Sequence, residues 1–253
     1  MIMEGMEKAF PVTGNAKAVT IKMVHEDDMD VSSELVLIRE YKLRILVDGI
    51  ERIDIVCTPT NLRELILGRL MTEGIIRSAR DAALTMIRED EGVACVSLKR
   101  ANDGPAAYSI LRKPVNRVYE IPWDHSWIWT LEERFNKDTR LHKKTHATHS
   151  CFLMRSGKIL HEAEDIGRHN AIDKVVGWAL LNRVPLEECI LYTTGRMPVD
   201  MVLKVIRAGI PVMVSKEVPT LEGLHTAQQY GLTLICGLKH GKMNVFYGYG
   251  DAI

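Results

Sequence analysis

The sequence lacks any C-x-x-C motif, and its five cysteines are odd in number and widely spaced. Disulfide frameworks and cysteine-rich zinc sites need more cysteines at closer spacing, so the pattern argues against both and favours a reducing cytoplasm. Long apolar runs are also absent, and no window of the sequence is suited to cross a bilayer. The segment Met1–Thr13 has no extended apolar core, so we do not expect a secretory signal.

No charge of one sign prevails, because Lys and Arg together number 33 and so do Asp and Glu. A balanced chain has no global electrostatic field, so we expect neither nucleic acid nor a membrane as a partner. Any anion must therefore be bound by a local cluster of residues. The 253 residues are 46% hydrophobic and 26% charged, which is typical of a globular protein with one large or two smaller domains.

The first half of the chain predicts β-hairpins around one helix. Asp48-Gly49 is a dipeptide typical of hairpin turns, and β-branched runs lie on both sides of it. Thr60 or Asn61 is suited to cap a helix that runs to Glu73. The expected strands are Leu35–Val47, Ile50–Val56, Ala83–Glu89 and Val93–Lys99.

The second half alternates strands with helices, and its strands are continuously apolar, as in sheets that are buried on both faces. We therefore predict an α/β fold in which residues 1–125 form a smaller β-rich α+β domain and residues 126–253 form a layered α/β domain with a parallel βαβαβ run. Residues 112–146 are expected to connect the halves. The expected helices are Asn170–Leu181, one that starts at Pro198 and one that ends at Tyr230, and the expected strands are Ile190–Thr194, Ile210–Ser215 and Leu232–Cys236.

Polar and basic residues follow three successive strands of this run, in the segments Thr193–Arg196, Ser215–Thr220 and Gly237–Lys242. Ligands bind such sheets beyond the carboxyl ends of the strands. A glycine and an arginine just before a helix N-terminus, as at Gly195-Arg196, suit a phosphate. A plain strand-to-helix turn explains the same residues as readily, so both interpretations stay open for that turn.

The densest polar run, Glu164–Asn170, directly precedes an apolar helix. Its acid, arginine, histidine and amide would suit a polyfunctional ligand, although Asp165 or Asn170 could equally cap the helix. His146 and His149 lie three residues apart without a third ligand nearby, so we expect no metal site.

Residues Glu164–Gly177 read EDIGRHNAIDKVVG. This run resembles the signature E-D-[IV]-G-R-H-N-A-[LV]-D-K-x-x-G of the formate dehydrogenase accessory sulfurtransferase (FdhD/NarQ) family. Shorter similarities lie at Thr72–Ile76, Thr194–Lys204 and Ser215–Thr220, so the resemblance covers about residues 34 to 247.

The resemblance implies a cytidine deaminase-like second domain and a function in molybdenum cofactor sulfuration. Proteins of this family bind the molybdenum bis(molybdopterin guanine dinucleotide) cofactor and take sulfur from a cysteine desulfurase as a persulfide. They pass the sulfur to the cofactor before its insertion into formate dehydrogenase. We accordingly expect a cytoplasmic homodimer with that cofactor as cargo. The expected cofactor contacts are Leu238, Lys239, His240, Gly241, Lys242, Gly195, Arg196, Arg168, His169, Asn170 and His146.

Two departures from the family pattern bear on the sulfur chemistry. The family's cysteines usually lie in a C-x-x-C loop between the halves, yet residues 100–145 contain no cysteine. The glycine pair that precedes the main signature is replaced by Lys143-Lys144. Cys151 lies near the matched site, and neighbouring lysines would lower its pKa, whereas the apolar residues Phe152–Met154 favour a buried, inert thiol.

Two hypotheses therefore stay open. The first is a sulfurtransferase that uses Cys151 as its catalytic thiol. The second is a non-catalytic chaperone that holds the molybdenum cofactor and transfers no sulfur. A zinc deaminase, which the fold alone would suggest, needs the motifs H-x-E and P-C-x-x-C, and the sequence contains neither.

Overall fold

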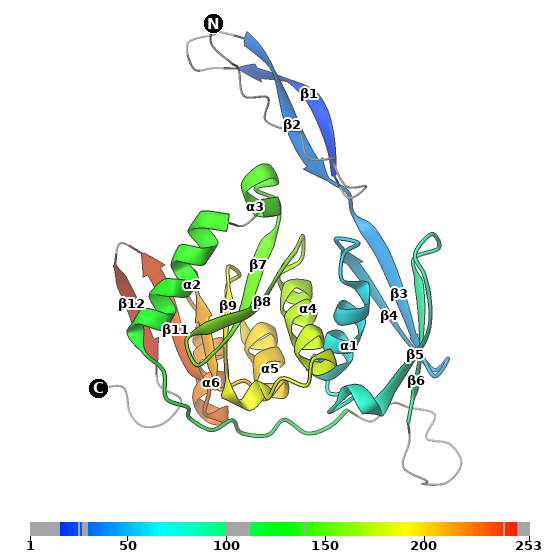
Figure 1. Ribbon diagram of the computed structural model, residues 1–253, viewed down its shortest axis with the longest axis vertical. Helices are drawn as coiled ribbons and strands as arrows, with labels where there is room; N and C mark the ends of the chain where they lie inside the picture. Colours follow the sequence, from blue (N-terminus) through cyan, green and yellow to red (C-terminus); the bar gives the residue numbers. More distant parts are fainter. Residues whose placement is uncertain are drawn as a thin grey trace, which may run out of the picture.

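The computed structural model describes residues 16–24, 26, 30–99, 112–138, 140–239 and 241–246. Two helices pack against each other between a four-stranded and a six-stranded sheet (Figure 1). These helices are α1 (Leu62–Thr72) and α4 (Arg168–Leu181). The architecture is therefore a mixed α/β fold in which helices lie between and outside two sheets.

The four-stranded sheet has the order β4-β3-β6-β5. Both predicted hairpins are confirmed, because β3 pairs with β4 and β5 pairs with β6, each in antiparallel fashion. Asp48 and Gly49 turn the first hairpin with φ of 50° and 67°. A short 3-10 helix, Ala79–Asp81, precedes β5. The strands are β3 (Tyr41–Val47), β4 (Glu51–Cys57), β5 (Ala82–Arg88) and β6 (Val93–Leu98).

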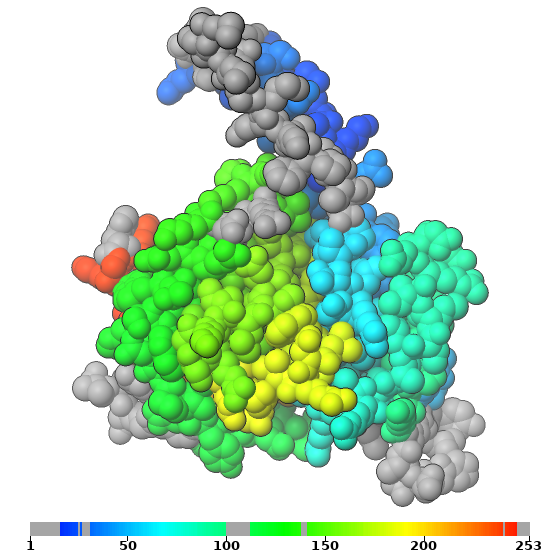
Figure 2. All heavy atoms as spheres, in the orientation of Figure 1, coloured from blue at the N-terminus to red at the C-terminus, as the bar shows by residue number. Residues whose placement is uncertain are grey.

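The predicted strand Leu35–Val47 is wrong as a single element. Its first residues belong to β2 (Asp30–Ile38), which pairs with β1 (Ala16–Val24) in a separate two-stranded ribbon. This ribbon stands out from the body of the molecule, as the space-filling view in Figure 2 also shows. The break falls at Arg39 and Glu40, two consecutive polar residues that interrupt the apolar run.

Helix α1 buries one face against the four-stranded sheet and another against α4. Gly68 and Gly177 lie where the two helices cross. A Cβ at residue 68 would lie 1.7 Å from the carbonyl oxygen of Asp173, and one at residue 177 would lie 1.8 Å from that of Glu64. These glycines therefore allow a backbone approach that no other residue permits. Asn61 occupies the N-cap position of α1, but its side chain makes no cap hydrogen bond.

The six-stranded sheet has the order β12-β11-β10-β9-β7-β8. The predicted parallel run is confirmed for β9, β10 and β11, which α5 (Val199–Arg207) and α6 (Leu221–Tyr230) connect. The other three strands run antiparallel to their neighbours, so the sheet is mixed. The strands are β7 (His149–Arg155), β8 (Lys158–Asp165), β9 (Cys189–Thr193), β10 (Val212–Ser215), β11 (Thr233–Lys239) and β12 (Lys242–Phe246).

The connector between the halves begins without regular structure at residues 112–124 and continues as α2 (His125–Asp138) and α3 (Arg140–Thr145). The predicted apolar stripe of Ile128, Leu131 and Phe135 is confirmed, since all three side chains are buried against the six-stranded sheet. Helices α4, α5 and α6 cover the opposite face of that sheet. The domain boundary between residues 125 and 126 and the likeness to cytidine deaminases stay predictions.

Candidate functional site

At one edge of the six-stranded sheet, four strands begin or end. We use the word edge for this row of strand ends. Strands β9 and β10 end there, and because β7 runs antiparallel to β9, its first residue lies at the same edge. His149 of β7 pairs in turn with Asp165 at the end of β8. The main signature run, which starts α4 directly after β8, therefore meets the turn after β9 at this edge.

Arg168 lies across Gly195 at the centre of this edge. A Cβ at residue 195 would lie 2.9 Å from Cβ and 3.0 Å from Cδ of Arg168, so glycine is needed for the arginine to occupy this place. The Nε of Arg168 is buried and donates no hydrogen bond to the residues that the structure describes. The neighbouring Arg196 is exposed. The turn thus offers an unused guanidinium donor and a second positive charge to an anion.

Helix α4 starts two residues earlier than predicted, with Gly167 as its N-cap. Arg168 and His169 therefore occupy the first helical turn, which contains no acidic side chain. A cation in this place is opposed by the helix dipole, whose positive end points to the N-terminus. A bound anion would relieve this repulsion and would meet the free N–H groups of the first turn.

His149 is a member of this edge that sequence reasoning considered only as a metal ligand. Its Nδ1 lies 3.4 Å from Thr194 Oγ1, which also accepts a hydrogen bond of 3.1 Å from Ser150 N–H. Burial lowers the pKa of His149, and the positive charge of Arg168 lowers it further. The neutral imidazole is therefore favoured at this position. His149 is the first residue of β7 and lies beside the turn after β9. This position follows only from the antiparallel pairing of β7 with β9.

His169 points to the other side of the α4 N-terminus. Its Nε2 lies 2.6 Å from Asp200 Oδ2 in the first turn of α5. Burial raises the pKa of Asp200, but the hydrogen bond and the charge of His169 outweigh burial and hold the pKa below its usual value. A groove of about 440 Å³ lies below this pair between β4 and α5, with Arg69 and Arg207 in its wall. His169 and Arg168 thus flank the helix start on two sides.

Asn170 was predicted to contact the cofactor, and that contact stays a prediction, because the amide nitrogen of Asn170 is engaged within the protein. Its side chain is 5% exposed, and its Nδ2 donates to Val56 O at 2.7 Å and to Asp165 Oδ1 at 2.9 Å. Both amide hydrogens are therefore used within the protein. Asp165 also accepts from the backbone of Thr58 and Gly167, so this part of the signature joins α4 to the end of β4.

A second buried network uses the polar residues that follow in the signature. Lys204 Nζ donates to Asp173 Oδ1 and to Thr72 Oγ1, each at 2.8 Å, and Arg69 Nη1 lies 3.3 Å from Asp173 Oδ2. These four residues come from α1, α4 and α5. Thr72 and Lys204, which belong to two of the matched motifs, therefore help to hold three helices together.

The stretch 238–242 was predicted to be a loop that contacts phosphates. Instead Leu238 is 1% exposed in the core, and Lys239 pairs with Lys242 across the tight hairpin between β11 and β12. The segment is therefore a strand and a hairpin rather than a loop, and a cofactor contact of Leu238 stays a prediction. Gly241 turns the hairpin with φ of 71°, and both lysines are exposed. His240 lies outside the described residues.

His146 follows α3 and is exposed, with φ of 51°. Its ring lies 5.8 Å from that of His142 in an edge-to-face arrangement. His142 Nδ1 lies 2.6 Å from Thr148 O, so α3 is tied to the start of β7.

The residues described contain no group of three His, Cys, Asp or Glu side chains arranged to hold a metal ion. Among them, no helix is both long and apolar enough for a bilayer.

Cys151 does not fit the predicted catalytic thiol. Its side chain is fully buried in the centre of β7, and burial raises its pKa well above the ordinary value. Burial likewise raises the pKa of Cys57 and of Cys189 to about 12. Cys236 is buried as well, and Cys95 on β6 is half-buried. A persulfide carrier needs an accessible thiolate, so the geometry speaks against Cys151.

Comparison with known proteins gives consistent results. The model of the FdhD/NarQ family matches residues 38–252. The Sulfur carrier protein FdhD of Wolinella succinogenes is 29% identical over 254 residues, which cover 91% of this chain and 87% of that protein. The protein of the same name from Halalkalibacterium halodurans is 28% identical, with 93% and 94% covered. The crystal structure of a candidate formate dehydrogenase accessory protein from Desulfotalea psychrophila superimposes with a TM-score of 0.78 at 25% identity, covering 92% of this chain and 97% of that one.

Proposed function

This chain belongs to the FdhD/NarQ family, and on that basis we propose that it is an accessory protein of formate dehydrogenase maturation. Its cargo is the molybdenum bis(molybdopterin guanine dinucleotide) cofactor. The sheet edge around Arg168 and Gly195 holds a phosphate of that cargo. The protein acts in the cytoplasm as a homodimer and delivers the cargo to formate dehydrogenase.

The observation that carries this proposal is the contact between Arg168 and Gly195. The guanidinium lies at a helix N-terminus with its Nε buried and without a hydrogen-bond partner among the described residues. A buried donor without a partner costs about 1–3 kcal/mol, more for a charged group, so it indicates a missing acceptor. A diphosphate supplies several negatively charged acceptors and matches the planar guanidinium. The exposed Arg196 beside it adds a second contact.

Calorimetric titration with GDP tests this assignment, because GDP carries the guanine and diphosphate of the cargo. We expect GDP to bind the wild-type protein and Arg168→Ala or Arg196→Ala to weaken binding about tenfold or more, the effect of losing one charge-assisted hydrogen bond. Lys137→Gln is the matched control, since Lys137 is an exposed cation on α2. Equal affinities in all four proteins would remove both arginines from the binding site.

Sulfur transfer is the second candidate function. It is favoured by the name Sulfur carrier protein that the relatives bear. In this chemistry a protein thiolate attacks the terminal sulfur of the desulfurase persulfide, which leaves the desulfurase cysteine as a thiol. None of the five cysteines lies in the segment 100–145, and four are buried. We therefore propose that the cargo is held without a persulfide on Cys151.

Intact-protein mass spectrometry separates the two candidates. The protein is incubated with a cysteine desulfurase and cysteine, beside the variants Cys151→Ala and Cys95→Ala. We expect no mass gain on any of the three proteins. A gain of one sulfur atom that Cys151→Ala abolishes would restore the first hypothesis. A gain abolished by Cys95→Ala would make the half-buried thiol of β6 the carrier.

A further inference from the structure

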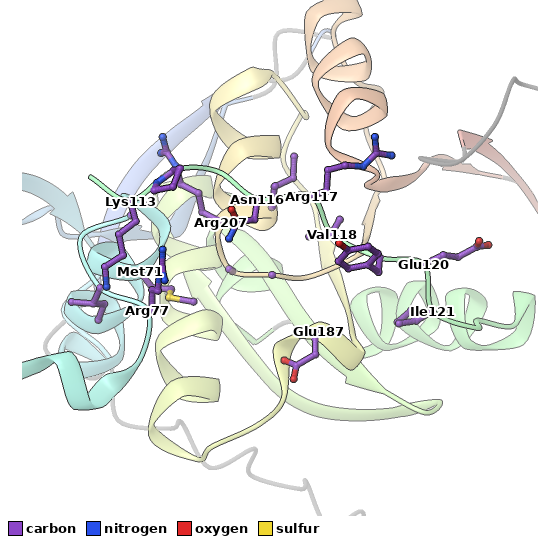
Figure 3. Close-up of a pocket in the computed structure, with 17 residues that line it drawn as sticks. Met71, Arg77, Lys113, Asn116, Arg117, Val118, Glu120, Ile121, Glu187 and Arg207 are labelled. Atoms are coloured by element: carbon purple, nitrogen blue, oxygen red, sulfur yellow. The ribbon is translucent and has the colours of Figure 1, made fainter. Parts of the chain in front are cut away.

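A second cavity, of about 510 Å³, lies at the opposite edge of the six-stranded sheet (Figure 3). It is bounded by the residues after α1, by the end of α5 and by Glu187, which lies two residues before β9. The segment Lys113–Ile121 crosses it. Since β9 ends at the edge where Arg168 lies, this cavity is separated from the proposed cargo site by the length of the strand.

Backbone hydrogen bonds hold the crossing segment at Lys113 and at Val118. Lys113 N–H donates to Gly74 O at 2.8 Å, and Val118 N–H donates to Tyr230 O at 2.9 Å. Gly74 has φ of 77°, and a Cβ there would lie 3.3 Å from Lys113 O. The cavity therefore has fixed walls on both sides, and its size falls within the range of small-molecule sites.

Charged side chains line the cavity. Arg77 and Lys113 lie together at one end, Glu187 and Glu120 lie apart from them, and Arg117 lies beside Val118 (Figure 3). Lys113 shares its charge with Asp81, whose carboxylate lies 3.3 Å away at the surface. Arg77 is exposed, so solvent and a charged solute can reach it.

Arg207 adds a buried donor to the wall. Its Nη1 donates to Thr72 O at 3.3 Å, but its Nε is buried without a hydrogen-bond partner among the residues described. The remaining wall is largely apolar and includes Met71, Val118 and Ile206. The cavity thus combines a cationic end with an apolar interior.

We infer that this cavity binds an organic anion, a carboxylate or a phosphate ester carried on an apolar body. The anionic group contacts Arg77 and Lys113, and the apolar body lies along Met71 and Val118. Inorganic phosphate does not bind appreciably, because it covers none of the apolar wall and so lacks that contribution to the binding free energy.

Ligand-observed NMR, by saturation transfer, tests this site with phenyl phosphate and phenylacetate as probes. Benzyl alcohol is the uncharged comparison, and excess GDP keeps the proposed cargo site occupied. We expect one or both anions to bind, and benzyl alcohol and inorganic phosphate not to bind measurably. Binding of a single anion identifies the head group as phosphate or carboxylate. Binding of neither anion would overturn the inference.

The double variant Arg77→Gln/Lys113→Gln should lower the affinity for the anion about tenfold or more. The control is Lys137→Gln/Lys158→Gln, which removes two exposed cations elsewhere on the surface. Arg196→Ala should leave the probe affinity unchanged. An unchanged affinity in the Arg77→Gln/Lys113→Gln protein would overturn the assignment. Displacement of the probe by GDP, or its loss in Arg196→Ala, would place it at the other edge.

Discussion

Asp165 and Lys174 form an ion pair of 2.7 Å in which both side chains are fully buried. Lys174 Nζ also donates to Thr58 O and Thr60 Oγ1, at 3.1 and 3.0 Å. The most distinctive motif of the sequence therefore serves two purposes. Arg168 and His169 face the surface at the start of α4, while the acids and the lysine behind them join the two halves of the chain.

Lys174→Met should destabilise the protein by about 3–5 kcal/mol, because it leaves Asp165 buried without its counter-ion. The free energy of unfolding in urea measures this effect. Lys137→Met, at an exposed position on α2, is the control and should change stability by less than about 0.5 kcal/mol. A loss below about 1 kcal/mol in the Lys174 variant would show that the pair does not hold the halves together.

Gly68→Ala should destabilise the protein by at least about 3 kcal/mol. Alanine normally favours a helix over glycine by about 1 kcal/mol, but here its Cβ would overlap Asp173 O at 1.7 Å and force α1 away from α4. Gly209→Ala is the matched control, since it has open space around it and a φ of 82°. Its cost should be limited to the backbone strain of about 1–2 kcal/mol. Thermal or urea unfolding that ranks Gly209→Ala as the more damaging would contradict the helix-contact argument.

Thiol labelling should separate the cysteines by burial. At pH 8 a thiol with a pKa of about 12, such as Cys57 or Cys189, has roughly one molecule in ten thousand as thiolate. We expect iodoacetamide to modify Cys95 first in the native protein and to modify all five cysteines after unfolding. Peptide mass spectrometry identifies the labelled sites. Rapid native labelling of Cys151 would reveal an accessible thiol there and would reopen the sulfurtransferase hypothesis.

Stability should fall on acidification through the titration of His149. Burial and the charge of Arg168 lower its pKa, so between that value and the ordinary value of about 6.5 the unfolded chain binds more protons than the folded one. The free energy of unfolding is therefore not reduced by His149 above about pH 6.5, and it falls as the pH drops below that value. Urea unfolding at pH 7.5 and 5.5 should show a smaller pH-dependent loss for His149→Gln than for the wild type.

His161 needs its own control in that experiment. Its pKa is lowered by burial as well, and its ring stacks on Trp178 at 4.4 Å. His161→Gln should also reduce the pH-dependent loss of stability. The double variant His149→Gln/His161→Gln should reduce that loss by the sum of the two single effects. If both single variants lose as much stability between pH 7.5 and 5.5 as the wild type, neither imidazole is kept neutral by the fold.

The local sequence determined the elements that depend on residues close together in the chain, such as turns, helix caps and apolar strands. The hairpin at Asp48-Gly49 and the parallel β9-β10-β11 run follow from turn chemistry and continuous apolar strands, and both are confirmed. Thr220 caps α6 by accepting a hydrogen bond from Gly223 N–H, a feature that Thr at a helix start indicates. Gly195 and Arg168 were both predicted as contacts, although nothing in the sequence shows that they touch.

The tertiary structure alone showed which polar residues are partners inside the protein. Asn170 and Lys174 are as polar in the sequence as Arg168, but long-range pairing with residues before α1 satisfies their hydrogen bonds and buries them. Leu238 was assigned to a loop because the expected strand ended at Cys236, yet β11 continues through it into a hairpin. Burial depends on partners more than 100 residues away in the chain, and no local pattern encodes that distance.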